Sequence, residues 1–174
     1  NATQQALSAG KTNEAIENTQ QIQELSQFAL GEMRLLIFEL RPRILEVEGL
    51  AAALQDRLNL VEARTGFNTS IRVVGERPLD PSIESELYAI ANESLNNALK
   101  HSKAEQVTVI LEYTVDSVCL QVWDDGIGFD QSDPDLSKGF GLRNMEERAS
   151  RMGGSFSLDS AAGAGTVVEV EVAA

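Results

Sequence analysis

Polar side chains that could bind a metal ion gather in one short stretch near the middle of the chain. Residues 92–97 include three asparagines and a glutamate, and Glu93 and Asn97 are four positions apart. In a helix this spacing places both side chains on one face, with Lys100 about one turn further on. An amide oxygen and a carboxylate suit Mg²⁺, which keeps substrate phosphates and water as ligands, and Lys100 could offset phosphate charge. A solvated helix face would carry the same charges, so both interpretations stay open here.

A second candidate is Asp124, which ends a stretch of alternating apolar residues, 117–124, that predicts a strand. By this alternation Asp124 continues a buried row. A buried carboxylate is costly unless it is hydrogen-bonded, and the amino group of a flat heterocycle would serve as partner. Gly126 and Gly128 would let the backbone approach such a ligand closely, although Asp-Gly is also a common turn signal.

Two more glycine pairs follow. Gly139 and Gly141 open a predicted helix, where free backbone N–H groups form an anion site. Gly163 and Gly165 precede the last predicted strand, and a hairpin turn accounts for these glycines but not for Thr166. Each pair is a weak signal alone.

Helices and strands must position these residues. Apolar periodicity predicts helices over 11–40, 50–64, 83–100 and 142–152. Alternation predicts strands over 69–74, 106–113, 117–124, 155–159 and 166–172, with loops at Pro78 to Pro81 and over 126–138. This order predicts an α+β fold with helices on one face of a mostly antiparallel sheet. The first helix, ended by Pro42, has two apolar stripes and is typical of a helical bundle.

The composition excludes several classes of function. The 174 residues include 27 acidic and 14 Lys or Arg side chains, which gives a net charge of −13. This charge argues against nucleic acid as a partner, because a nucleic-acid site needs a basic surface. A single cysteine, Cys119, cannot form an internal disulfide. No apolar run is long enough to span a membrane and no signal peptide is recognisable, so we expect a cytoplasmic segment without direct membrane contact.

The order and spacing of the motifs resemble the ATP-binding domain of sensor histidine kinases, of the GHKL superfamily that includes gyrase. The matching segments are Asn92-Glu93, Asn97-Ala98-Leu99-Lys100-His101, Asp124-Asp125-Gly126-Ile127-Gly128, Gly139-Phe140-Gly141-Leu142 and Gly165-Thr166. In that family they are the N-box, the two glycine boxes and the closing Gly-Thr. Further segments are similar to the subfamily that signals to NarL/LuxR-type response regulators: Leu40-Arg41-Pro42, Lys100-His101-Ser102-Lys103-Ala104, Gly128-Phe129 and Gly141-Leu142-Arg143-Asn144-Met145-Glu146-Glu147-Arg148.

The resemblance implies a two-layer α/β sandwich, the Bergerat fold, preceded by a long helix of a dimerisation four-helix bundle. Residues 1–42 would be the end of the dimerisation region, 43–65 a connecting helix and 66–174 the catalytic ATP-binding domain. The full-length protein would then be a homodimer.

The resemblance also implies roles for individual residues toward ATP and Mg²⁺. Asn97 would coordinate Mg²⁺ between the phosphates, and Glu93 would polarise the nucleophile or a water and is the second candidate for contact with the metal. Asp124 would accept a hydrogen bond from the adenine amino group, with Thr166 nearby. The other residues implied to bind the nucleotide or to hold the lid over it, residues 130–138, are Lys100, His101, Gly126, Gly128, Lys138, Gly139, Gly141 and Leu142.

The implied activity is transfer of the γ-phosphoryl group of ATP to a histidine, and then onward to a NarL/LuxR-type response regulator. His101 is the one histidine of the chain and lies inside the N-box match. We therefore expect the acceptor histidine to be absent from the chain, which would bind ATP without phosphorylating itself. Two alternatives are an anti-sigma-factor-type serine kinase of the same fold and a non-catalytic dimerisation module.

Overall fold

The computed structural model describes residues 11, 12, 16, 19, 42–131 and 140–173. Contacts divide the chain into two compact units, Asn1–Arg41 and Pro42–Ala174. In the first unit Thr12, Ile16 and Thr19 are helical. The rest of the helix predicted over 11–40, with its apolar stripes, lies outside the described residues.

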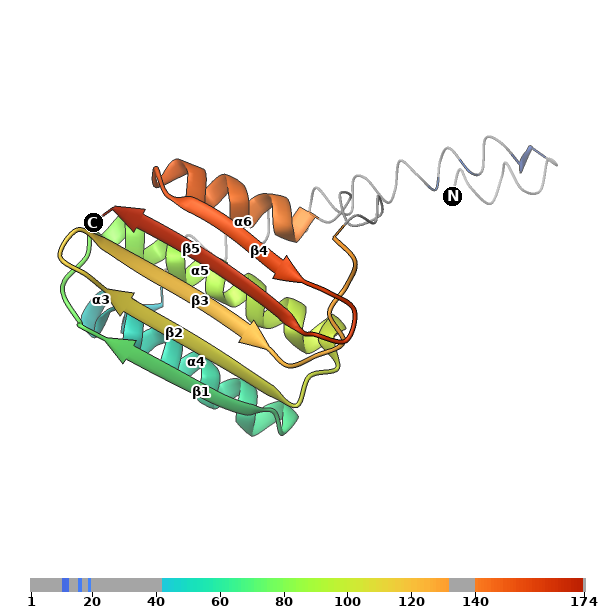
Figure 1. Cartoon of the computed structure of the whole chain (residues 1–174), viewed down its shortest axis with the longest axis horizontal. Helices are drawn as coiled ribbons and strands as arrows, with labels where there is room; N and C mark the ends of the chain where they lie inside the picture. The colour runs from blue at the N-terminus through green and yellow to red at the C-terminus, as the bar shows by residue number, and fades with distance from the viewer. Residues whose placement is uncertain (1–10, 13–15, 17–18, 20–41, 132–139, 174) are drawn as a thin grey trace. The chain divides into compact units, whose positions relative to one another are not determined.

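Five strands of the second unit form one sheet in the order β1-β2-β3-β5-β4 among the described residues (Figure 1). Strand β1 pairs in parallel with β2, and the other neighbours are antiparallel, which confirms the predicted mostly antiparallel sheet. The strands are β1 (Asn68–Val74), β2 (Gln106–Tyr113), β3 (Ser117–Asp124), β4 (Ser155–Ser160) and β5 (Thr166–Ala173).

Helices cover one face of this sheet, so the fold is the expected two-layer α/β sandwich. In Figure 1, α4 lies behind β1 and β2, and α5 lies behind β3 and β5. Within the described ranges, no helix is both long enough and apolar enough to cross a membrane. The helices are α3 (Arg43–Val47), α4 (Gly49–Thr65), α5 (Pro81–Asn97), the π-helix η1 (Ala98–Ser102) and α6 (Phe140–Arg151).

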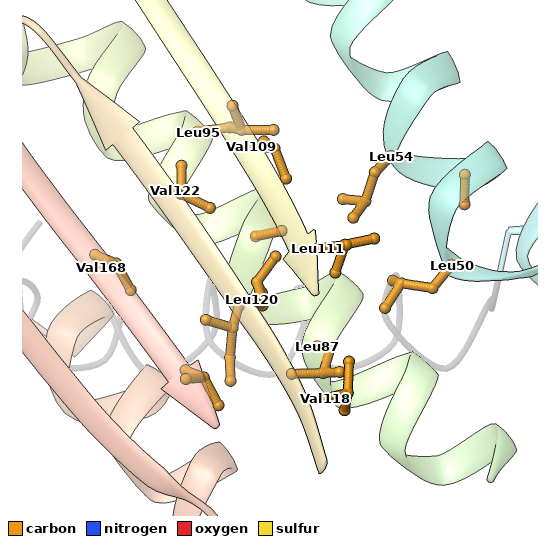
Figure 2. Close-up of a cluster of buried hydrophobic side chains, with 14 of the residues drawn as sticks. Leu50, Leu54, Leu87, Leu95, Val109, Leu111, Val118, Leu120, Val122 and Val168 are labelled. Atoms are coloured by element: carbon orange, nitrogen blue, oxygen red, sulfur yellow. The ribbon is translucent and has the colours of Figure 1, made fainter. Parts of the chain in front are cut away.

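The core lies between the two layers. Alternate residues of β2 and β3 are buried, as the apolar alternation predicts, and they face apolar residues of the helices. Figure 2 shows leucines and valines from α4, α5, β2, β3 and β5 pointing toward one another. Segment 43–65 belongs to this core, because Leu45, Leu50, Leu54 and Leu58 are at most 2% exposed.

Helix α5 differs from the prediction at both ends. It begins at Pro81 and not at Ile83, because the Asp80 side chain caps the first turn by accepting a hydrogen bond from the Ser82 N–H (2.8 Å). Proline suits this position, since it has no N–H to satisfy. At the other end the α-helix stops at Asn97 and the chain continues as η1. Thus Lys100, predicted on the same α-helix, lies on a π-helical turn.

Candidate functional site

Helix α6 starts directly against the polar face of α5. A Cβ atom built on Gly141 would collide with Oε1 of Glu93 and would lie 3.5 Å from Nδ2 of Asn97. The structure therefore brings together the N-box pair and one glycine of the second glycine box, 44 or more positions apart in the chain. A side chain at position 141 would displace the Glu93 carboxylate from this place.

Helix α6 is held on α5 by a charged cluster on the same side of the sheet. Arg148 donates a hydrogen bond to Oε2 of Glu86, and the side chains of both residues are largely buried. Arg151 lies 3.5 Å from the other carboxylate oxygen of Glu86. Buried Met145 of α6 also contacts Ser94, whose hydroxyl lies 3.3 Å from its sulfur. These contacts determine where the first turn of α6 meets Glu93.

The three asparagines of segment 92–97 do not share one task. Asn92 and Asn96 accept hydrogen bonds from Arg57 of α4, at 2.8 Å from Nε and 3.0 Å from Nη2. Their oxygens are thus used, as the residue types suggested, but by a side chain of the protein. Asn97 instead lies with Glu93 beside Gly141, in the first turn of α6. Arg57 was missed from the sequence, although a cation directly before the buried Leu58 of α4 signals a polar partner.

Asp124 ends strand β3 and is 7% exposed, which confirms the buried row. Its Oδ1 accepts a hydrogen bond from the N–H of Gly126 (2.9 Å). Within the part of the chain that the structure describes, Oδ2 has no hydrogen bond. Burial raises the pKa of the Asp124 carboxyl, the Gly126 hydrogen bond opposes this shift, and the charge of Asp125 adds to it. A hydrogen-bond donor at Oδ2 would stabilise the ionised form.

Asp125 has a structural role that the sequence did not separate from that of Asp124. Its Oδ1 accepts hydrogen bonds from the backbone N–H groups of Glu105 and Gln106, both at 2.9 Å. These bonds attach the end of β3 to the start of β2. The two neighbouring aspartates therefore have different partners. Asp124 bonds within its own turn, and Asp125 bonds the segment that leads into β2.

Glycines allow three backbone segments to meet at Asp124. A Cβ on Gly126 would lie 2.5 Å from the Ser102 Cβ and 2.7 Å from Asp124 Oδ1. Gly165 has φ +76°, and its Cβ would collide with the carbonyl oxygen of Asp124. Gly128, at φ +55°, would similarly meet the Gly165 carbonyl oxygen at 2.7 Å. The turn explanation for Gly165 was incomplete, because this residue also packs against the end of β3.

Thr166 lies opposite Asp124 in the β3–β5 register and is half-buried. Its hydroxyl is 3.1 Å from the hydroxyl of Ser160, which also donates to the Gly165 carbonyl (2.9 Å) and accepts from the Phe129 N–H (3.0 Å). Ser160 is a residue that sequence reasoning missed. Its signal was alternation, since Ser160 follows Phe156 and Leu158 on the inner face of β4.

The other residues predicted to bind the nucleotide lie on η1, on α6 or outside the described residues. Lys100 and His101 are exposed on η1, and Leu142 is half-buried against the core. Lys138 and Gly139, with most of segment 130–138, lie outside the described residues. In the described ranges no group of three or more His, Cys, Asp or Glu side chains could hold a metal ion. A metal at Glu93 and Asn97 would therefore need further ligands from a bound substrate or water.

Known proteins are similar to this chain in sequence. Residues 82–174 match the family described as "Histidine kinase-, DNA gyrase B-, and HSP90-like ATPase". The oxygen sensor histidine kinase NreB of Staphylococcus carnosus is 32% identical over 92% of this chain, and the chain covers 46% of NreB. The sensor histidine kinase LiaS of Bacillus subtilis is also 32% identical over 92% of this chain, which covers 44% of LiaS. The chain thus spans less than half the length of these curated relatives.

Solved structures share the fold. The blue-light activated histidine kinase of Erythrobacter litoralis aligns over 84% of this chain and 49% of its own, with TM-score 0.64 and 20% identity. The histidine kinase AdeS of Acinetobacter baumannii aligns over 98% of this chain and 91% of its own, with TM-score 0.60 and 16% identity. With its family match over more than half of its residues, the chain belongs to the histidine kinase-, DNA gyrase B- and HSP90-like ATPases, and its relatives are sensor histidine kinases.

Proposed function

We propose that the chain binds Mg-ATP and is the catalytic part of a sensor histidine kinase. The observation that carries this proposal is the meeting of two separate motif pairs. Glu93 and Asn97 lie against Gly141, and Asp124 lies against Gly126 and Gly165. The first set can hold a metal and phosphates, and the second leaves Oδ2 of Asp124 as an acceptor for an amino group.

Asp124, the last residue of β3, binds the adenine base. Oδ2 accepts a hydrogen bond from the adenine amino group while Oδ1 stays on the Gly126 N–H. Because the carboxylate is buried, this bond forms in a medium of low dielectric and discriminates well against bases without the amino group. Thr166 is the partner of Asp124 in the β3–β5 register. Its hydroxyl contacts that of Ser160, which holds the carbonyl of Gly165 in place.

Asn97 and Glu93, which lie beside the first turn of α6, act on the phosphates. The donor set of one amide and one carboxylate fits a Mg²⁺ ion that takes its other ligands from phosphate and water. The metal would neutralise the charge that develops on the phosphoryl group. Asn97 would hold this ion beside the phosphates, and Glu93 accepts a proton from, or polarises, the attacking group. Lys100, His101, Leu142, Gly139 and Lys138 complete the nucleotide site in this proposal.

The phosphoryl acceptor is a histidine outside the chain. His101 is the one histidine of the sequence and is exposed at the end of η1, inside the N-box. The proposal therefore requires an acceptor on another polypeptide or on sequence beyond residues 1–174. We further propose a cytoplasmic location, dimerisation through the helical region that includes 1–42, and a NarL/LuxR-type response regulator as the next acceptor.

Titration calorimetry tests the nucleotide site directly. Wild-type chain is titrated with a non-hydrolysable ATP analogue in the presence of Mg²⁺, and then compared with Asn97→Asp and Asp124→Asn. We expect both variants to bind more weakly. If both bind as the wild type does, the site assignment is wrong.

Phosphotransfer tests the reaction. The chain is mixed with labelled ATP and a purified dimerisation domain that carries the acceptor histidine, and the label on the protein is followed. Acid-labile, base-stable label identifies phosphohistidine and supports the kinase proposed here. Acid-stable label would identify the serine-kinase alternative, and Mg-ATP binding without any transfer to a competent acceptor would contradict a catalytic role.

A further inference from the structure

We propose that Arg57 is a positioning residue that sets the rotation of α5 and thereby places Glu93 and Asn97 for the nucleotide. This inference rests on the proposed function of that pair. Arg57 lies on α4, in segment 43–65, and is half-buried between the two helices. It contacts neither Glu93 nor Asn97 among the hydrogen bonds of the described residues, so it would act through the helix that carries them.

The Arg57 clamp, defined as Arg57 with Asn92 and Asn96, spans one turn of α5. Nε donates to Asn92 Oδ1 at 2.8 Å, and Nη2 donates to Asn96 Oδ1 at 3.0 Å. A guanidinium is planar and presents its donors in a fixed fork, so two bonds to acceptors one turn apart define an orientation. A single bond would add less to the constraint that core packing already places on the rotation of α5. Asn92 is 8% exposed, which shields its hydrogen bond from competing water.

The clamp and the site occupy neighbouring strips of the same helix. Each of Asn92 and Asn96 is followed directly by a site residue, Glu93 or Asn97. At about 100° per residue the two strips are therefore about 100° apart around the axis. Any rotation of α5 that the clamp prevents would move Glu93 and Asn97 across the first turn of α6.

The size of this effect follows from helix geometry. Side chains reach about 5–6 Å from a helix axis, so a rotation of about 10° displaces a site atom by about 1 Å. A displacement of that size from a remote change costs up to about a hundredfold in catalysis. The Glu93 carboxylate lies next to Gly141, so a rotation of this size would move it relative to the first turn of α6.

The experiment separates positioning from simple stability. Affinity for the non-hydrolysable ATP analogue is measured with saturating Mg²⁺ and again with EDTA, and the ratio of the two dissociation constants reports the contribution of the metal site. Arg57→Met, Arg57→Lys and Asn96→Ala are compared with the wild type, each at a temperature where urea titration shows it folded. Gln55→Met is the matched control, because Gln55 donates to Asn59 within α4 and not to α5.

We expect Arg57→Met to reduce the Mg²⁺-dependent ratio by about tenfold, the usual size for a residue that orients a metal ligand. Arg57→Lys should recover part of this loss, since one ammonium can reach one amide oxygen, and Gln55→Met should change nothing. If Arg57→Met only lowers stability and leaves the ratio unchanged, the inference is overturned. Should Arg57→Met not fold, the ratio for Asn96→Ala decides the matter in the same way.

The same data distinguish the two proposals. A wild-type chain that shows no gain from Mg²⁺, or an Asn97→Asp variant that keeps the full gain, would overturn the proposed function and this inference together. A normal wild-type gain that is lost in Asn97→Asp but intact in Arg57→Met would overturn the inference alone.

Discussion

The substitution Asp124→Asn should affect nucleotide binding and fold stability in opposite directions. The asparagine keeps an oxygen that can accept the Gly126 N–H, at 2.9 Å in the wild type. It replaces the second carboxylate oxygen by an NH₂ group, which donates and cannot accept from an adenine amino group. The variant thus preserves the internal hydrogen bond and removes the one proposed for the ligand.

The magnitudes follow from these two changes. A hydrogen bond to a charged group contributes about 1.5–3 kcal/mol, so the dissociation constant should rise about 10- to 150-fold. Stability should not fall, because the substitution removes a carboxylate that is 7% exposed. Burial holds the pKa of Asp124 above 3.8 in the folded state. The native state therefore binds this proton more tightly than the unfolded state, and the Asp124 contribution to stability is lost as pH rises through the folded pKa.

Two measurements on the same samples check this reasoning. Calorimetry gives the dissociation constant of Mg-ATP, and urea unfolding between acidic and neutral pH gives the free energy of unfolding. We expect the stability of Asp124→Asn relative to the wild type to increase as pH rises above about 3.8, the ordinary pKa of an aspartate. Asp159→Asn, which removes an exposed carboxylate of β4, is the control for charge alone. Unchanged affinity, or a variant less stable than the wild type at neutral pH, would refute the argument.

Four further substitutions test the packing around the site. Gly165→Ala should lower the free energy of unfolding by at least about 2 kcal/mol in urea titrations, since φ is +76° and the new Cβ would meet a β3 carbonyl oxygen. Gly163→Ala, at φ +80° with open space around it, should cost only about 1 kcal/mol, and equal losses for the pair would exclude the contact as the cause. Gly141→Ala should weaken Mg-ATP binding about tenfold by calorimetry while the fold stays intact, because its Cβ displaces a carboxylate on α5; normal affinity would show that this carboxylate moves aside freely. Glu86→Gln should destabilise the fold by about 1–2 kcal/mol in the same urea assay, as Arg148 loses its charged partner, and an unchanged unfolding midpoint would argue against that role.

Strand positions were predictable because alternation is a local property. The inner rows of β2 and β3 follow from every second residue being apolar, and the same rule placed Asp124 inside. Ser160 obeys this rule too, and its burial could have been predicted from Phe156 and Leu158. The start of α5 was less predictable, because Asp80 and Pro81 have the composition of a loop and become a helix start only when the aspartate caps it.

The roles of Asn92 and Asn96 could not be read from the chain alone. Segment 92–97 presents three amide side chains of the same type, and although spacing pairs Asn97 with Glu93, nothing local shows what the other two contact. The difference arises from Arg57, which is 35 and 39 positions away and reaches only two of them. The turn explanation of Gly165 was incomplete for the same reason, since its close neighbour is Asp124, far from it in sequence.

The amino-acid sequence by itself determined the kinds of element, their order and the motif pairs, because hydrophobic periodicity and the order of glycine boxes are properties of consecutive residues. Tertiary structure alone decided which distant residues meet: Glu93 with Gly141, Asp124 with Gly165, and Arg57 with two asparagines. Such pairs form when helices pack on a sheet, and their geometry depends on distances between elements that no local pattern encodes.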